Sequence, residues 1–335
     1  MAVTKSTTVS PSKQDLMIYV EQEMLSHAEP VLVLEKLGQI KPVPKNKGRI
    51  IEFRRPRVWT ANTTPLAEGV TPAPRTFSYD HVSCTLSQFG EVSQLTDVIE
   101  ETYTDPVLND MTMITGENAG RSKEQLIFGV VKAGTNVVYA NDSSRAAVNT
   151  VISRDKLDLA TRSLRNNKAM RFTKILDGST NTKTSPIEAS YVAVCHTDLE
   201  HDLENLPGFV PVAEYGNRKL ISEYEYGAVG KTRFITTPDL DAWASAGGTP
   251  GSTVLSTDGS SADVYPVLIF GREAFGCCPL RGQGAIEPTV IPVGNKTKDD
   301  PLGQRGYVGY KFWHGTVVLN EGWMVRLEVG ASALS

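Results

Sequence analysis

The segment from Gly48 to Asp97 constrains the fold most, because two β-rich stretches enclose a long polar loop with nothing obvious to pack on. The first stretch, GRIIEFRRPRVW, alternates its side chains between two faces as a strand does, and RTFSYDHVSCTLSQFGEVSQLTDV returns from the loop. The loop itself, TANTTPLAEGVTPAP, is stiffened by three prolines but has too few apolar residues for a core. Loops this long are usually functional or disordered. We therefore expect an arm that packs on another copy of the chain, which favours assembly over chemistry.

Size and charge narrow the class of protein. The chain has 335 residues, of which 40% are hydrophobic, so its length suggests about two domains with a core. Its net charge of −4, from 34 basic and 38 acidic residues, argues against a protein that binds duplex DNA through its phosphates. The one dense basic cluster, Arg54, Arg55 and Arg57, lies on the arm. We interpret it as an ion-pairing edge facing an acidic neighbour, with a nucleic-acid contact as the alternative.

The sequence predicts neither a membrane span nor a disulfide framework. Its apolar runs are short, and MAVTKSTTVSPSKQ lacks the apolar region of a signal peptide, so we expect a non-secreted protein. Four cysteines are too few for a disulfide framework in a chain of this size. Cys277 and Cys278 are adjacent, and neighbours on a strand face opposite sides. We expect free thiols and no shared metal ion.

Three helices are expected before and within the middle of the chain. One lies over Lys13–Leu25. The strongest signal opens at Asp105, a good N-cap, followed by Pro106 at the first helical position. Its inner face is predicted to hold Val107, Met111, Ile114, Leu126, Val130 and Ala133, with a bend or break near Gly116 and Gly120. Another helix starts at Ser153, with Leu157, Ala160, Thr161 and Leu164 inside.

Strands and a loop-rich insertion complete the pattern. Tyr191–Cys195 reads as a buried strand, followed by a capping box over Thr197–Glu200. Asp239–Asp263 is rich in Gly, Ser and Thr and is predicted to be a flexible surface insertion before the strand Val264–Gly271. YVGYKFWHGTVVL and WMVRLEV predict the closing strands. This order, with a middle segment inserted between parts of one domain, predicts an α+β fold.

Motifs for catalysis or metal binding are weak. Gly230-Lys231-Thr232 resembles a phosphate loop, but Glu225 stands where that loop needs glycine. The cluster His196, Asp198, Glu200, His201 and Asp202 has its histidines five apart, which in a helix puts them on different faces. We interpret it as a solvated helix face rather than a metal or acid–base site. We expect no enzyme, no catalytic residues and no cofactor or metal.

Five strings in order carry a resemblance to a known family: PLAEGVTP, QFGEVSQLTDVIEET, VVKAGTNVVYA, EYGAVGKTRFI and DPLGQRGYVGYKFWHG. Together they resemble major capsid proteins of tailed bacteriophages of the podovirus N-four type, which have the Hong Kong phage-type major capsid fold. The resemblance implies residues 1–45 as the N-terminal arm, 46–96 as the extended β-hairpin loop, 97–186 as the peripheral domain with its spine helix, 187–299 as the axial domain, and 300–335 as the return to the peripheral domain.

The resemblance also implies a function and partners. The chain would assemble with itself as hexamers and pentamers into the icosahedral shell of a virion, in the host cytoplasm, around double-stranded DNA that it does not bind sequence-specifically. A portal protein, a separate scaffolding protein and a decoration or cement protein are the further implied partners, the scaffold because the arm begins almost at Met1. We expect contacts between subunits at the following arm and loop residues: Arg54, Arg55, Arg57, Pro65, Leu66, Glu68, Thr71 and Pro72.

Other interpretations stay open at this point. A cellular nanocompartment shell has the same fold, and composition does not separate it from a virus. A cytoplasmic α+β hydrolase would use the cluster from His196 to Asp202. A jelly-roll capsid fits less well, because short strands do not explain the long helix. Some shells of the implied fold are welded through a loop lysine, but no lysine lies between Lys47 and Lys123, so non-covalent cohesion is expected.

Overall fold

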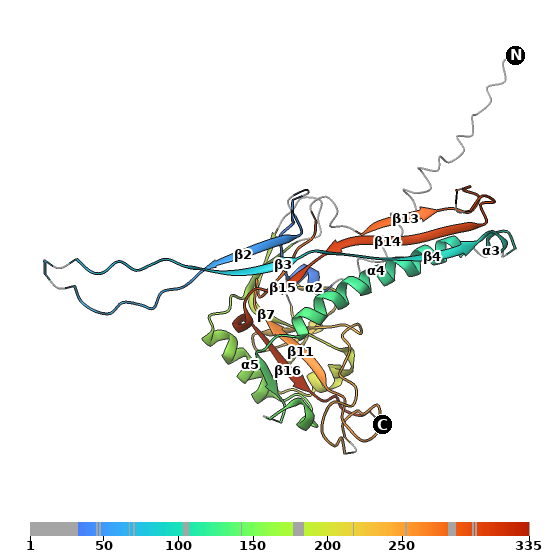
Figure 1. Cartoon of the computed structure of the whole chain (residues 1–335). Coiled ribbons are helices and arrows are strands. Elements are labelled where there is room, and N and C mark those ends of the chain that lie inside the picture. Colours follow the sequence, from blue (N-terminus) through green and yellow to red (C-terminus); the bar gives the residue numbers. More distant parts are fainter. Residues whose placement is uncertain are drawn as a thin grey trace, which may run out of the picture.

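The computed structural model describes residues 33–334, apart from positions 45, 47, 67, 70, 103–106, 142, 177–183, 217, 252, 281–285, 297 and 299. The helix expected over Lys13–Leu25 and the helix start expected at Asp105 and Pro106 lie outside these residues. Helices and strands are mixed along the chain, which confirms the α+β class. Figure 1 shows a wide sheet with helix α5 packed beside it, and the long helix α4 below a narrow sheet. A hairpin reaches away from these two sheets.

The wide sheet has eight strands in the order β5-β16-β11-β7-β10-β9-β8, with β6 paired to β7. Their bounds are β5 Val137–Tyr139, β6 Phe172–Leu176, β7 Thr184–Cys195, β8 Phe209–Pro211, β9 Glu225–Val229, β10 Thr232–Thr236, β11 Tyr265–Phe270 and β16 Met324–Val329. Strands β7 and β11 confirm two predicted strands, and β16 confirms the last. Every residue of β11 and β16 is buried, because separate hydrophobic clusters cover the two faces of the sheet.

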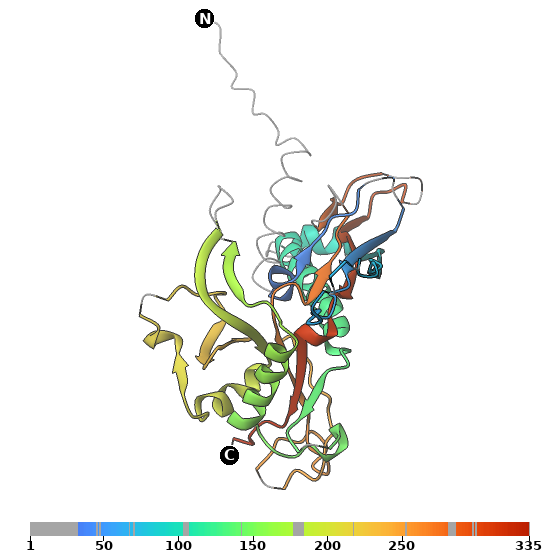
Figure 2. The ribbon, with the colours of Figure 1, turned by 90° about the vertical axis from the view of Figure 1, so that its left-hand side faces the viewer.

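Helix α5, Arg154–Asn166, covers one face of this sheet (Figure 2). Ser153 caps it by accepting a hydrogen bond from the Lys156 N–H, and the four residues predicted to face inward are its buried ones. The capping box predicted at Thr197–Glu200 is wrong. His196 is the N-cap of η3, Thr197–Leu199, because its Nδ1 accepts from the Asp198 N–H at 3.1 Å. Helix α6, Glu200–Glu204, then follows directly.

The long helix α4, Val107–Lys132, is confirmed in position but not in detail. It runs without interruption through Gly116 and Gly120, which are buried, so the expected break is wrong. The expected inner face is right only in part: Met111 and Leu126 pack against hydrophobic clusters, but Ile114 is 61% exposed and Ala133 lies beyond the helix end. The buried face instead holds Thr112, Thr115, Gly116, Ala119, Gly120, Lys123, Glu124, Ile127, Phe128 and Val131. Small residues let neighbouring elements approach the helix closely, and partners from distant segments satisfy its buried charges.

The narrow sheet lies along α4 and has the order β13-β14-β4. Its strands are β4 Ser87–Thr96, β13 Glu287–Ile291 and β14 Arg305–His314, and β14 pairs with β4 along its whole length. A second small sheet joins β1 Gln39–Ile40, β12 Phe275–Cys277 and β15 Thr316–Val318, and β2 Ile50–Pro56 pairs with β3 Tyr79–Thr85. The short helical elements are α2 Leu34–Leu37, α3 Asp97–Thr102, η2 Arg145–Ala147, η4 Val212–Glu214 and η5 Glu321–Trp323.

The division into arm, loop, peripheral and axial domains remains a prediction. The strand order shows how the last predicted segment, residues 300–335, is connected to the others. Among the described residues, the last segment contributes to three of the four sheets: β14 to the narrow sheet, β15 to the small sheet and β16 to the wide sheet. Strand β16 is tied to η2 by the buried carboxylate of Glu328, which accepts two hydrogen bonds from Arg145 at 2.8 Å and one from Arg326 at 2.7 Å. The Arg326 guanidinium ties β16 to α4, because it donates to the carbonyl of Lys132, the last residue of that helix, and to the Gly134 carbonyl at 2.9 Å.

The segment Asp239–Asp263, predicted to be a flexible surface insertion, has no helix or longer strand among its described residues. It is nevertheless tied to the body. Trp243 forms a β-bridge with Val264, and Val254 forms one with Ser332. The carboxylate of Asp263 accepts from the Ser245 N–H at 2.7 Å and the Thr257 hydroxyl at 2.8 Å. Leu240, Val254 and Ala262 are buried, so the segment is also packed.

Candidate functional site

The hairpin of β2 and β3 is anchored only at its base. Phe53, Cys84 and Leu86 are buried there with Val43 and Cys278 in a small hydrophobic cluster. The two strands pair from Ile50 opposite Thr85 to Pro56 opposite Tyr79. Beyond this pair, the described residues between 57 and 78 form no helix or strand, and they extend far from the rest of the molecule (Figure 1).

The predicted basic cluster lies at the outer end of the paired strands. Arg57 Nε contacts Asp80 Oδ1 at 2.7 Å, and Arg55 contacts Asp80 Oδ2 at 3.5 Å. The hydrogen bond from Arg57 contributes most to lowering the pKa of Asp80. Arg55 and Arg57 therefore have an acidic partner on the return strand of their own chain, and their part in contacts between subunits stays a prediction. Arg54 is exposed, and no ion pair of this side chain is found in the described part of the chain.

The predicted contact residues of the loop tip are all exposed: Pro65, Leu66, Glu68, Thr71 and Pro72. Leu66 has 73% of its surface open to solvent. The two limbs of the loop are tied to each other, since the Arg75 guanidinium donates to the Thr60 carbonyl at 2.8 Å. A stiff loop joined across its limbs and free of the body can present its side chains to a partner with little loss of conformational entropy.

Large apolar residues on the limbs of the loop complete this surface, and the sequence analysis missed them. Val58 is 91% exposed and Trp59 is 51% exposed, next to Arg57. On the return limb, Phe77 and Tyr79 are exposed and stack edge to face with ring centroids 4.7 Å apart. Aromatic and arginine side chains together are typical of the residues that carry the energy of protein interfaces. The available signal was the pair Val58–Trp59, placed between a basic cluster and a polar loop.

Exposed apolar side chains also occur on β4, α3 and α4, the elements that lie away from the hairpin loop (Figure 1). Val92 on β4, Val98 on α3 and Ile114 on α4 each have more than half of their surface exposed.

The cluster from His196 to Asp202 is held by structural contacts. Asp198 accepts from the Tyr265 hydroxyl at 2.7 Å, and the His201 ring lies 3.2 Å from the Asn205 amide nitrogen. Asp202 is buried and accepts from the Ser332 N–H at 2.9 Å, which anchors the C-terminal segment. Among the described residues, no three His, Cys, Asp or Glu side chains are grouped so that they could hold a metal ion. The interpretation as a solvated helix face is therefore wrong for Asp202, which is buried, while Asp198 and His201 are exposed.

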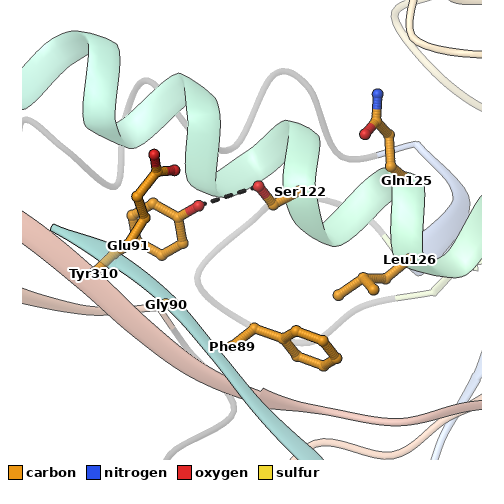
Figure 3. Close-up of a pocket in the computed structure, with 7 residues that line it drawn as sticks. All are labelled: Phe89, Gly90, Glu91, Ser122, Gln125, Leu126 and Tyr310. Carbon is orange, nitrogen blue, oxygen red and sulfur yellow. Dashed lines mark hydrogen bonds between the residues drawn. The ribbon is translucent and has the colours of Figure 1, made fainter.

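One groove of about 410 Å³ lies between α4 and the narrow sheet (Figure 3). Its lining residues are Phe89, Gly90, Glu91, Ser122, Gln125, Leu126 and Tyr310. The Ser122 and Tyr310 hydroxyls lie 3.1 Å apart, and burial is the main cause that raises the pKa of Tyr310. The lining contains no histidine, cysteine or lysine to activate a nucleophile. The groove offers shape and hydrogen-bonding groups, among them the carboxylate of Glu91 and the hydroxyls of Ser122 and Tyr310.

The four cysteines all lie among the described residues, and none of them is exposed. Cys277 and Cys278 contact different hydrophobic clusters, which confirms that they face opposite sides, and all four cysteines are buried and free. Burial raises the pKa of Cys277 to about 12, so its thiol is unreactive at neutral pH. Within the ranges that the structure describes, we find no helix with the length and hydropathy to cross a bilayer.

Comparisons with known proteins place the chain in one family. The family model described as "Phage capsid protein" matches residues 82–327. The major capsid protein of Pseudomonas phage KPP21 is 25% identical over 207 residues, which cover 57% of this chain and 52% of that protein. The alignment thus spans about half of the curated relative.

Solved structures show the same fold. The capsid of Ralstonia phage GP4 matches with a TM-score of 0.63 and 12% identity over 89% of this chain and 88% of that one. The head of Helicobacter pylori bacteriophage KHP40 matches with a TM-score of 0.57 and 12% identity over 88% of each chain. These matches confirm the predicted capsid fold, while the narrower resemblance to the N-four type stays a prediction. Since the family model spans most of its length, the chain belongs to the phage capsid protein family.

Proposed function

We propose that this chain is the major capsid protein of a tailed double-stranded DNA bacteriophage and that it assembles as hexamers and pentamers into an icosahedral shell. The observation that carries the proposal is the hairpin loop, which exposes Val58, Trp59 and Leu66 far from the body of its own subunit. A monomeric protein would leave this apolar surface in water. Membership of the capsid family and the likeness to phage shells support the same conclusion.

The loop is proposed to lie on a neighbouring copy within the same assembly. The contact residues are those named from the sequence, with Val58, Trp59, Phe77 and Tyr79 added from the structure. Standard interfaces bury about 800 Å² per partner. A loop of this length, with the aromatic rings of Trp59 and Phe77, can supply a good part of that area. Arg55 and Arg57 share the single carboxylate of Asp80, so this part of the surface keeps a net positive charge.

The further parts of the account are proposals by likeness to the family. We propose the division into arm, loop, peripheral and axial domains, a location in the virion after assembly in the host cytoplasm, and no catalytic role. A scaffolding protein, a portal protein, a decoration protein and the packaged DNA are proposed as partners.

Electron microscopy tests the proposal. The full chain, expressed with the scaffolding protein of its own virus, should form closed shells of uniform size. A nanocompartment shell would instead close without a scaffold and enclose a protein cargo, so particles that form from the chain alone and carry protein would favour that alternative. Monomers under every condition, with and without the scaffold, would refute both.

A further inference from the structure

The most unusual buried groups of the molecule lie where the described chain begins. The segment from Val33 to Val43 crosses helix α4 and then joins the small sheet through β1. Val33, Leu34 and Leu37 are buried against Ile127 and Val131 of α4. Further along, the Lys41 N–H donates to the Cys277 carbonyl at 3.0 Å and the Val43 N–H donates to the Pro279 carbonyl at 2.8 Å. This segment is therefore docked on the body as a strap.

The strap is held on α4 by ionisable side chains that are largely buried. Glu124 is fully buried, and its carboxylate accepts from the Leu34 N–H at 2.8 Å and the Val33 N–H at 3.3 Å. Lys123 is also buried, and its Nζ lies 2.7 Å from Oε1 of Glu35. Two successive residues of α4 thus point ionisable side chains at the strap. Burying these side chains carries a desolvation penalty that an apolar face would not have.

The balance of these interactions controls the charge of Glu124. Burial raises the pKa of this carboxyl to about 7, the two backbone N–H bonds oppose the change, and the nearby Glu35 and Asp239 carboxylates add to it. Once released into water, the same group would return to the ordinary value of 4.5. Docking of the strap is therefore coupled to uptake of a proton between these two values.

The other charged and titratable groups around Glu124 come from every element packed there. Glu35 on α2 pairs with Lys123, and Asp239 after β10 pairs with Arg121 of α4 at 3.3 Å. His314 on β14 is buried, and its pKa is lowered to about 4 by burial and by Lys123. Cys277 on β12 has its pKa raised to about 12. Of the groups here with a displaced pKa, Glu124 is the one that changes charge between pH 5 and pH 8.

We propose that Glu124 is a pH-sensitive latch that holds the strap Val33–Val43 on the long helix when it is protonated and loosens it when it is ionised. The sign follows from the raised value: the docked state binds the proton more tightly, so docking is strongest below pH 4.5 and weakens as pH rises through 7. The docking equilibrium constant should fall by roughly one to two orders of magnitude between pH 5 and pH 8. This inference concerns the folded subunit and does not depend on shell assembly.

Amide hydrogen exchange of the full chain tests the latch. Protection of the Leu34, Lys41 and Val43 amides, after correction for the intrinsic dependence of exchange on pH, should fall by about the predicted factor from pH 5 to pH 8. In Glu124→Gln the amide oxygen still accepts hydrogen bonds but cannot ionise, so protection should not change with pH. Glu117→Gln makes the same chemical change at a half-buried position of the same helix and should behave as the wild type.

Two results would overturn the proposal: protection in the wild type that does not change with pH, or a pH dependence in Glu124→Gln equal to that of the wild type. If Glu124→Gln fails to fold, Asp239→Asn decides the question. It removes a carboxylate that disfavours ionisation of Glu124, and it leaves behind Arg121, whose side chain is mostly exposed. The midpoint of the change in protection should then move to lower pH, and an unchanged midpoint would contradict the latch.

Discussion

Replacing Trp59 by alanine should leave the free subunit as stable as before and weaken its assembly. Within the subunit, the Arg75 guanidinium lies over this ring, 6.0 Å from its centroid. About half of the side chain is open to water, 51% of its surface. A surface substitution of this kind changes the free energy of unfolding by no more than about 0.5 kcal/mol.

The loss in assembly can be worked from the same exposure. A tryptophan buries roughly 200 Å² when it is fully covered, so about 100 Å² remains for a partner to cover. At about 25 cal/mol per Å², this area contributes about 2.5 kcal/mol to each loop contact. The association constant for one contact should then fall about 60-fold. If each subunit offers one loop, the critical concentration for assembly should rise by a similar factor.

Light scattering across a range of subunit concentrations measures that critical concentration, and denaturant unfolding of the free subunit measures its stability. Trp59→Phe keeps most of the apolar area and should assemble at close to the wild-type concentration. An unchanged critical concentration for Trp59→Ala would show that no subunit covers this ring. A subunit destabilised by several kcal/mol would show that the ring packs within its own chain.

Three further predictions concern the loop, the buried charges and the cohesion of the shell. Deletion of Thr60–Pro74 should give a subunit with an unchanged circular dichroism spectrum and melting temperature that forms few particles, whereas an unfolded subunit would place the loop in its own core. Glu328→Gln should lower the free energy of unfolding by about 3–5 kcal/mol, because Arg145 and Arg326 lose the buried charge that they share; a change below about 1 kcal/mol in denaturant unfolding would contradict this role. Mature shells boiled in detergent should run as one band near 36.5 kDa, since the loop carries no lysine for a covalent cross-link, and a ladder that survives reductant would show otherwise.

Helix α5 shows what the sequence can establish about the fold. Ser153 starts it, and Leu157, Ala160, Thr161 and Leu164 share one face, so the cap and the apolar period agree and the burial follows from them. Helix α4 shows the opposite case. Ile114 looks like a core residue yet is exposed, while Lys123 and Glu124 look like surface residues yet are buried. Their partners, Glu35 and the backbone of Val33 and Leu34, lie about 90 residues away in sequence, and no local period reveals a contact of that kind.

Some features of the hairpin loop could be predicted from the sequence and others could not. The prolines and polar residues of the loop predict its extension, because they supply stiffness and no core. The pairing of Arg55 and Arg57 with Asp80 depends on the register of β2 and β3, which is set by packing of Phe53, Cys84 and Leu86 at the base of the hairpin. The sequence marks Val58 and Trp59 as an apolar pair between a basic cluster and a polar loop, but the same residues on a packed strand would face a core, so their exposure follows only from where the loop lies.

A reconstruction of assembled particles by electron cryomicroscopy tests the central claim most directly, because it shows both the shell and the place of the loop. The account predicts closed shells of hexamers and pentamers in which residues 57–78 of each subunit lie on a neighbouring copy and Trp59 and Leu66 are covered by it. Particles in which the loop remains in solvent, or is folded back on its own subunit, would contradict the account.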